Sequence, residues 1–335
     1  MKILVTGGLG YIGSHVVVEL IQENHEVVIL DNLINSRVSV LDQIETITKV
    51  KPDFKKIDLK KKGDVISFFK KNKNIEGVIH FAALKSVSES VNRPIKYYKN
   101  NVIGMINLLE FIPKGIPLVF SSSCTVYGSS KTQPIDENTP FGIATSPYGH
   151  TKQICEQIME AEYKTEPHFK GISLRYFNPI GAHSSGLIGE NPKNTSENIM
   201  PYLTQVVDGK QDILTVYGND YPTKDGSCIR DYIHITDLSK AHCKAIEHLD
   251  NIKKDKFLEP INIGTGRGVS VLELIASFEK ATGEKVPFKI GKRRPGDVIT
   301  AYADTKKAEN MIGWKSEHSL SEALQSAWNW EHNKS

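Results

Sequence analysis

The chain is poor in cysteine and has no long apolar run. Its 335 residues include four scattered cysteines (Cys124, Cys155, Cys228 and Cys243) and no C-x-x-C pair. A disulfide framework or a metal site such as zinc is therefore not expected, and a reducing cytoplasm is the simplest compartment. No apolar run reaches the roughly 18 residues of a membrane-spanning helix. The opening residues contain no signal-peptide core, so we expect no leader and no membrane partner.

Charge of one sign is also scarce. Lys and Arg total 42 against 39 Asp and Glu, a net charge of +3 over the whole length. Such a weak, dispersed balance does not favour nucleic acid as a partner. Only seven of the basic residues are arginine. Since a planar guanidinium suits bidentate phosphate recognition, each arginine is more informative than a lysine here.

The length predicts about two domains. Short β-branched runs alternate with helical patterns in the first half, which indicates βαβ units. We therefore predict an α/β fold: a Rossmann-type, doubly wound parallel sheet over residues 1–178, and a smaller mixed α/β domain over 179–335. A segment near 230–265 is expected to return to the first sheet. The predicted strands are 3–6, 27–31, 54–58, 77–82, 118–123 and 172–175, and the last helix is 319–331.

A glycine pattern follows the first predicted strand directly. Gly7, Gly10 and Gly13 permit a tight turn, a close approach of backbone to a pyrophosphate, and a helix packed against the sheet. Asp31 ends the second predicted strand, where a carboxylate binds ribose hydroxyls and repels a 2′-phosphate. The first domain is thus predicted to bind NAD rather than NADP.

A second motif predicts the chemistry. Tyr148 and Lys152 are four residues apart at the start of a predicted helix, and therefore on one face. A neighbouring ammonium stabilises a phenolate, and lowering a phenol's pKa by three units takes about 4 kcal/mol. Ser123 ends a predicted strand at the cofactor-binding edge, where its hydroxyl can bind the substrate oxygen.

These motifs are joined by others in both halves of the chain, and together they resemble one family. The sequence is similar to the extended short-chain dehydrogenases/reductases, and among them to the UDP-glucose (UDP-galactose) 4-epimerases. The resemblance rests on residues 7–15, 31–33, 80–85, 121–128, 148–152, 175–183, 217–221, 230–234 and 293–297.

The resemblance implies reversible 4-epimerisation through a transient 4-keto sugar and bound NAD. Tyr148 would remove the 4-OH proton, Lys152 would hold the nicotinamide ribose, and Ser123 and Thr125 would assist at the oxygen. Tyr148, Lys152 and Ser123 are also implied cofactor contacts. The other implied cofactor contacts are Gly7, Gly10, Tyr11, Ile12, Gly13, Asp31, Asn32, Asn35, Ser36, Asp58, Leu59, Phe81, Ala82, Ala83, Lys85, Asn100 and Phe177.

The implied substrate is a UDP-sugar. Arg230 and Arg294 match the family's diphosphate clamp, and the other implied contacts are Lys85, Ser123, Tyr148, Asn178, Asn198, Ile199, Thr215, Val216, Tyr217, Asp297 and Ala301. Ala301 departs from relatives that have a bulky tyrosine beside the sugar 2-substituent. A small residue leaves room for an N-acetyl group, so UDP-GlcNAc and UDP-GalNAc are further expected substrates, unless Tyr302 fills the space.

Three alternative functions fit the sequence less well. A sugar-nucleotide 4,6-dehydratase needs an acid and a base, whereas the chain has Ser123-Cys124-Thr125 where such relatives place Thr-Asp-Glu. A reductase normally releases NADPH, which Asp31 disfavours. A non-catalytic nucleotide-sugar sensor would not need Ser123, Tyr148 and Lys152 together. The family also implies a homodimer formed through helices of the nucleotide domain.

Overall fold

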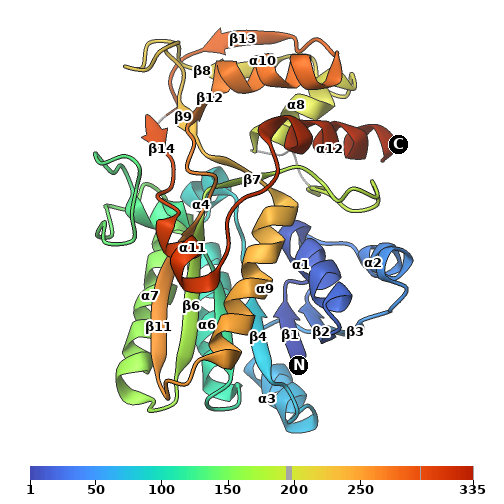
Figure 1. The fold of residues 1–335 in the computed structure, drawn as a ribbon, viewed down its shortest axis with the longest axis vertical. Coiled ribbons are helices and arrows are strands. Elements are labelled where there is room, and N and C mark those ends of the chain that lie inside the picture. The colour runs from blue at the N-terminus through green and yellow to red at the C-terminus, as the bar shows by residue number, and fades with distance from the viewer. Residues whose placement is uncertain (194–197, 295, 335) are drawn as a thin grey trace.

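The computed structural model describes residues 1–193, 198–294 and 296–334. Seven parallel strands form the central sheet in the order β3-β2-β1-β4-β5-β6-β11 (Figure 1). The predicted α/β fold with a doubly wound parallel sheet is confirmed. The strands are β1 (Lys2–Thr6), β2 (Glu26–Asp31), β3 (Asp53–Lys56), β4 (Gly77–His80), β5 (Pro117–Ser123), β6 (Lys170–Tyr176) and β11 (Phe257–Ile263).

Helices cover both faces of this sheet, because successive residues along each strand point alternately into two apolar clusters, one on each face. One face packs against α1 (Tyr11–Gln22), α2 (Val40–Thr48), α9 (Ile235–Asn251) and α11 (Lys306–Ile312). The other face packs against α3 (Lys62–Lys71), α6 (Ile103–Phe111) and α7 (Pro147–Thr165). Two short helices, α4 (Val87–Asn92) and α5 (Pro94–Tyr97), precede α6.

Strand ends differ from the sequence predictions by a few residues. β3 stops before Asp58, whose side chain accepts a hydrogen bond from the Lys60 amide at 3.1 Å and forms a turn. β4 stops at His80, because the following backbone bends toward the glycine loop, where the Ala82 amide meets the Thr6 hydroxyl at 3.4 Å. The last helix, α12 (Leu320–Asn333), begins one residue after predicted, since Ser319 is its N-cap in a capping box.

The smaller domain carries its own apolar cluster around α8, α10 and α12. Its elements are α8 (Ile199–Val207), β8 (Leu214–Tyr217), β9 (Ile229–Arg230), β12 (Val269–Ser270), α10 (Val271–Thr282), β13 (Phe288–Gly291), β14 (Thr300–Ala301) and α12. The paired strands β7 (Asn178–Ile180) and β10 (Tyr232–His234) connect it to the sheet.

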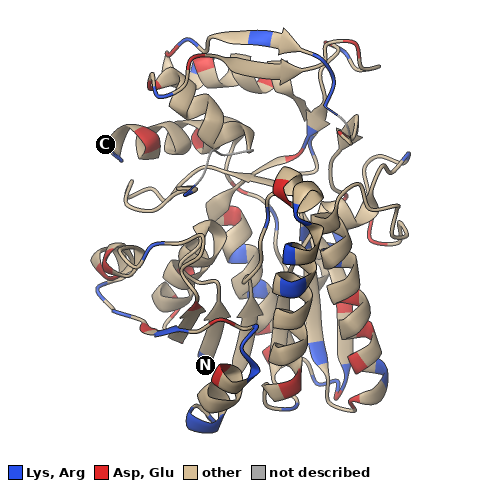
Figure 2. Cartoon of the chain, turned by 180° about the vertical axis from the view of Figure 1, so that it is seen from behind, with Lys and Arg blue, Asp and Glu red and all other residues tan. Residues whose placement is uncertain are grey.

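Several crossings join the two domains. The chain leaves the sheet after β6, returns for α9 and β11, leaves again, and returns once more for α11 (Figure 1). Positive and negative side chains are found on both domains (Figure 2). Within the part of the chain that the structure describes, every helix is too short or too polar to cross a membrane.

Candidate active site

The glycine loop between β1 and α1 is packed backbone against backbone. Gly7 has φ +71°, and a Cβ on it would lie 2.8 Å from the Ala82 amide nitrogen. A Cβ on Gly13 would lie 2.3 Å from the Gly7 carbonyl oxygen, so neither position tolerates a side chain. Gly10 is the N-cap of α1 and offers no side-chain acceptor. The first-turn amides of α1 are therefore suited to bind an anion such as a pyrophosphate.

The carboxylate of Asp31 lies beside this loop at the end of β2. It is 7% exposed and accepts hydrogen bonds from the Leu9 amide at 3.2 Å, the Leu33 amide at 2.8 Å and the Ser36 hydroxyl at 2.7 Å. These bonds fix the carboxylate without using all of its lone pairs. Its negative charge suits ribose hydroxyls and opposes a further phosphate. The loop and Asp31 together fit NAD.

The loop after β4 completes this edge. The side chain of Asn101, 3% exposed, accepts from the Leu84 amide at 2.8 Å and donates to the Leu84 carbonyl at 3.1 Å and the Thr151 hydroxyl at 3.0 Å. Asn101 lies in a π-helix, Tyr98–Val102, with the predicted cofactor residue Asn100, which donates to the Asn101 side chain. The Asn101 side chain thus joins the loop that holds Ala82 and Ala83 to α7.

The start of α7 places the two reactive side chains one turn apart. Ser146 is its N-cap and accepts from the Gly149 amide at 3.2 Å, while Pro147 takes the first helical position. Lys152 is 4% exposed, and its ammonium donates to the Ser121 carbonyl. The ammonium lies 5.9 Å from the centroid of the Tyr148 ring. The predicted pair therefore shares one face.

Burial controls the pKa of both groups. It raises the pKa of Tyr148 to about 12, against a hydrogen bond from Ser123 that lowers it. It lowers the pKa of Lys152 to about 8, against the raising influence of Cys155 and Glu156. In an apolar site each charged form is disfavoured. The phenol therefore begins further from ionisation than the sequence analysis expects.

Two hydroxyl groups, one at the end of β5 and one in the 3-10 turn after it, lie near the start of α7. Ser123 is 7% exposed and accepts from the Thr125 amide at 3.2 Å. The Thr125 hydroxyl is buried and has no hydrogen-bond partner among the described residues. It lies against the first turn of α7, 3.5 Å from the place a Gly149 Cβ would take. A buried hydroxyl without a partner is costly, so this one is well suited to a ligand oxygen.

Cys124 lies between these hydroxyls and offers no acid or base. Burial raises its pKa to about 12, so it remains a thiol.

Two histidines near the site are also explained by packing. His80 is 2% exposed and pairs with the Thr6 hydroxyl at 2.7 Å, whereas His150 is exposed and pairs with the Tyr98 hydroxyl at 2.8 Å.

A buried ion pair joins α7 to the strand β6. The Arg175 guanidinium on β6 contacts the Glu156 carboxylate at 2.6 Å, and the two side chains are 6% and 7% exposed. Arg175 also donates to the Tyr127 hydroxyl at 3.1 Å, which donates to Asn262 on β11 at 2.6 Å. This network links α7 to two strands and fixes the helix that carries the reactive pair.

On the small domain, the two predicted clamp arginines share one carboxylate. Arg294 contacts Asp297 at 2.8 Å and Arg230 contacts it at 3.6 Å. The Arg294 guanidinium also lies 5.4 Å from the Tyr217 ring centroid. The structure therefore brings Arg230, Arg294, Asp297 and Tyr217 together. Arg293 instead pairs with Asp220 at 2.7 Å.

Other predicted substrate residues lie on β7, at the start of α8 and on β8. Asn178 begins β7, Asn198 is the N-cap of α8, and Ile199 is its first residue. On β8, Thr215 is half-buried, but Val216 is 1% exposed and packs into the small-domain core. Because its side chain points away from the surface, Val216 can offer a ligand only its backbone.

Ala301 on β14 is 8% exposed and belongs to a small apolar cluster with Val126 and Phe177. Successive strand residues point to opposite faces, so the ring of Tyr302 points elsewhere. That ring packs against Gly268, whose Cβ would lie 3.2 Å from it. In this arrangement Tyr302 does not fill the space beside Ala301.

Comparison with known proteins agrees with this geometry. A UDP-glucose 4-epimerase of Bacillus subtilis (strain 168) is 48% identical over 333 residues, covering 99% of this chain and 97% of that protein. The chain belongs to the UDP-glucose 4-epimerase family. The UDP-glucose 4-epimerase of Stenotrophomonas maltophila, with bound NAD and formylated UDP-arabinopyranose, has TM-score 0.95, 44% identity, and coverage of 100% and 98%. That of Bifidobacterium longum, with NAD+ and UDP, has TM-score 0.94, 43% identity, and coverage of 99% and 98%.

The family profile that matches residues 4–327 is described as GDP-mannose 4,6 dehydratase. It spans nearly the whole chain. The sequence analysis expects Thr-Asp-Glu in a dehydratase where this chain has Ser123-Cys124-Thr125, and in the structure burial keeps Cys124 a thiol. The local chemistry thus agrees with the epimerase relatives.

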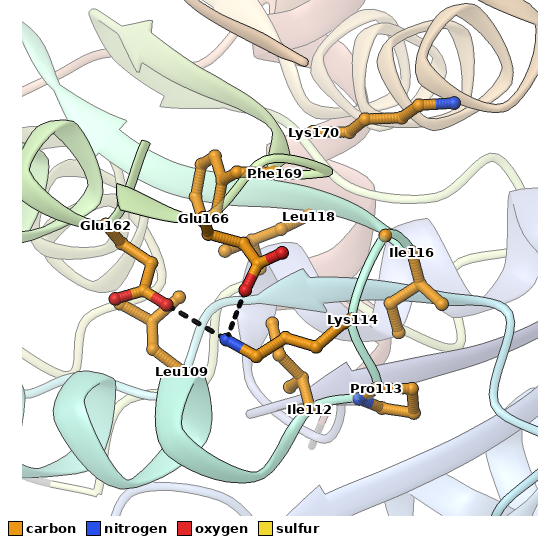
Figure 3. Close-up of a pocket in the computed structure, with 11 residues that line it drawn as sticks. Leu109, Ile112, Pro113, Lys114, Ile116, Leu118, Glu162, Glu166, Phe169 and Lys170 are labelled. Carbon is orange, nitrogen blue, oxygen red and sulfur yellow. Dashed lines mark hydrogen bonds and ion pairs between the residues drawn. The ribbon is translucent and has the colours of Figure 1, made fainter. Parts of the chain in front are cut away.

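A small cavity elsewhere is unrelated to this site. It holds about 20 Å³, enough for about one water, at the amino ends of β5 and β6 (Figure 3). There Lys114 pairs with Glu162 at 3.1 Å and Glu166 at 2.9 Å. The cavity lies at the opposite end of the strands from Tyr148.

Two residues of this epimerase-family site were not found from the sequence. Asn101 joins the cofactor loop to α7, and Glu190 contacts both Lys85 and Asn198. Their partners lie far away in the chain, so neither spacing nor periodicity points to them. The only local signal was an acidic residue, Glu190, inside a glycine- and proline-rich loop.

Proposed function

We propose that this protein interconverts UDP-glucose and UDP-galactose by NAD-dependent 4-epimerisation. The observation that carries the proposal is the meeting of Tyr148, Lys152 and Ser123 at the carboxyl edge of the sheet, beside the glycine loop and Asp31. A parallel sheet of this kind binds its ligand at that edge. The small domain faces it with two arginines that suit a diphosphate.

In the proposed mechanism, Tyr148 takes the proton of the sugar 4-hydroxyl. Bound NAD accepts hydride from C4 and later returns it to the opposite face of the transient ketone. Ser123 and Thr125 hold the reacting oxygen, and Tyr148 gives the proton back in the second half of the cycle. Lys152, fixed by the Ser121 carbonyl, stabilises the phenolate form of Tyr148 that exists before the first step and after the last one. Arg230 and Arg294 keep the diphosphate bound while the sugar turns over.

The energetic demand on Lys152 is considerable. With a pKa of about 12, Tyr148 lies five units above neutral pH, and each unit corresponds to about 1.4 kcal/mol. Ionising the phenol at pH 7 therefore costs about 7 kcal/mol, compared with the 4 kcal/mol that its free pKa implies. A closer contact of the Lys152 ammonium than the 5.9 Å to the ring centroid seen here, together with the positive charge of the bound nicotinamide, must supply this difference. The same burial that raises the pKa also strengthens these charge interactions.

N-acetylated sugars belong to the proposed substrate range. The side chain of Ala301 is small, and Tyr302 packs against Gly268 rather than beside it. This arrangement supports the acceptance of UDP-GlcNAc and UDP-GalNAc as well as the plain sugars. The test is to measure epimerisation of all four UDP-sugars; if only the plain pair reacts, the proposal for acetylated sugars is wrong.

We further propose that the protein forms a homodimer in the cytoplasm. Five exposed aliphatic residues gather on the stretch that includes α4, α5 and α6: Val87, Val91, Ile95, Ile103 and Ile106, each at least 40% exposed. Such a group favours association. The cysteines are four free thiols, as expected in a reducing compartment. Ile103→Glu with Ile106→Glu should yield a monomer by sedimentation; an unchanged mass would contradict this interface.

The decisive experiment is to incubate the purified protein with UDP-galactose and no added NAD. An epimerase that retains its cofactor brings UDP-galactose and UDP-glucose to equilibrium. A reductase or a sensor yields no UDP-glucose, and a 4,6-dehydratase yields a 6-deoxy-4-keto sugar instead. Chromatography of the nucleotide sugars separates these outcomes.

A further inference from the structure

A segment of the small domain lies across the nucleotide-binding edge. We call residues 181–193 the strap; it is the yellow-green stretch between α12 and α1 in Figure 1. The Tyr11 hydroxyl donates to the Gly181 carbonyl at 2.6 Å, and the Arg37 guanidinium donates to the Asn191 carbonyl at 3.0 Å. Tyr11 follows β1 and Arg37 follows β2, so the strap reaches two of the loops that hold predicted cofactor residues.

The strap is fixed from behind by α12. The Trp330 indole donates to the Glu190 carbonyl at 3.3 Å, and the Ser326 hydroxyl accepts from the Ala182 amide at 3.1 Å. Gly189 lies on the Trp330 ring, where an added Cβ would come within 2.5 Å. Ile188, 2% exposed, packs into the apolar cluster that α1 shares with the sheet. The strap is therefore a packed part of the fold.

The side chain of Glu190 contacts two residues that the sequence predicts to belong to the site, Lys85 and Asn198. Its carboxylate is nearly buried, and one oxygen accepts from the Lys85 ammonium at 2.5 Å and from the Asn198 amide at 2.7 Å. Lys85 belongs to the loop after β4, and Asn198 begins α8 in the small domain. The Glu190 carboxylate therefore positions the Lys85 ammonium of the nucleotide domain and the Asn198 side-chain amide of the small domain.

We propose that the strap keeps the dinucleotide bound between turnovers, and that Glu190 is a positioning residue acting through Lys85. The inference rests on the proposed function, since an enzyme that returns hydride to the same sugar has no need to exchange its cofactor. Release past the strap requires its contacts with the nucleotide domain to break, and those of Arg37 and Lys85 are among them. Charge-assisted hydrogen bonds are the stronger ones, so losing one should speed release about tenfold.

The test compares NAD release from the wild type, Glu190→Gln and Arg37→Met. Glu190→Gln keeps the size of the side chain and an acceptor for Asn198, but removes the negative charge facing Lys85. The matched control is Glu331→Gln on α12, another buried glutamate in an ion pair, with Lys210 at 2.9 Å. Released NAD is trapped by alcohol dehydrogenase and ethanol and followed as NADH absorbance. Thermal unfolding verifies that each variant is folded.

We expect NAD release from Glu190→Gln and Arg37→Met to be about tenfold faster than from the wild type and Glu331→Gln. In a Lys85→Met background, Glu190→Gln should add little, because its charged partner is gone; a merely structural role would add its full effect. Equal release rates from folded variants overturn the strap inference and leave the proposed function standing. A wild type that holds no NAD after purification also overturns the strap inference, whereas the proposed function fails only if UDP-galactose is not epimerised even with added NAD.

Discussion

Four buried histidines should make the protein sensitive to acid. His15, His80, His234 and His242 are each at most 5% exposed, and burial lowers their pKa values to about 3, 3, 4 and 4. In the unfolded chain a histidine has a pKa near 6.5. Below that pH the unfolded state binds protons that the folded state does not, so stability falls as the pH falls through 6.5.

The magnitude follows from these values. At pH 5 each histidine costs about 2 kcal/mol, and the four together cost about 8 kcal/mol. That is comparable with the whole stability of a typical domain, about 5–15 kcal/mol. Carboxyl groups whose pKa is raised by partial or full desolvation act in the opposite direction, since they bind protons more readily when folded: Glu19, Glu23, Glu137 and Asp231. The contribution of one histidine to this pH dependence is therefore best measured by substituting that histidine.

The assay is urea unfolding at pH 7 and pH 5. His242 packs against Phe81 and Tyr176, so His242→Met fills similar space without a titrating ring. The stability lost between the two pH values should shrink by about 2 kcal/mol in this variant. The exposed His168 serves as the control, and His168→Met should leave the loss unchanged. If His242→Met and the wild type lose the same stability, the reasoning from burial is refuted.

Four further predictions concern the site and its support. Tyr148→Phe should fold normally and lose at least about two orders of magnitude in kcat, the usual contribution of a general base; near-wild-type turnover would remove it from that role. With Lys152 at a pKa of about 8, kcat/KM should fall as the pH rises through 8, and Lys152→Arg should move the fall upward; an unmoved profile would assign it to another group. Ala301→Tyr should lower the rate on acetylated sugars relative to plain ones, and an unchanged ratio in a four-substrate assay would contradict the space argument. Arg175→Met should lower the free energy of unfolding in urea by about 3–5 kcal/mol, since the Glu156 carboxylate remains buried without its cation. Adding Glu156→Gln to this variant should restore part of the lost stability; a loss below about 1 kcal/mol in Arg175→Met would contradict a stabilising ion pair.

The fold was predictable where neighbouring residues decide it. β1, the glycine loop and α1 form one continuous pattern, and each glycine has a local steric reason. The start of α7 was predictable in the same way, since Ser146 and Pro147 cap the helix that carries Tyr148 and Lys152. The ends of strands were less predictable, because hydrogen bonds from other segments determine where β3 and β4 stop.

Long-range contacts were beyond the sequence. Arg175 could be recognised as part of a motif, but its pairing with Glu156 depends on how β6 and α7 pack. The same holds for Glu190 and Lys85, which are 105 residues apart in the chain. The pKa of Tyr148 is a third case, since the spacing of Tyr148 and Lys152 says nothing about how deeply the phenol is buried. Where the environment determines the property, only the folded arrangement reveals it.

The repeated returns of the chain to the central sheet affect how it can fold during synthesis. β11 (Phe257–Ile263) pairs with β6, and Trp314 still contributes to the core of the nucleotide domain. Since the amino-terminal part leaves the ribosome first, its sheet waits with an unpaired edge and an open apolar face until the residues from Phe257 to Trp314 have emerged. Nascent chains are expected to depend on chaperones until then.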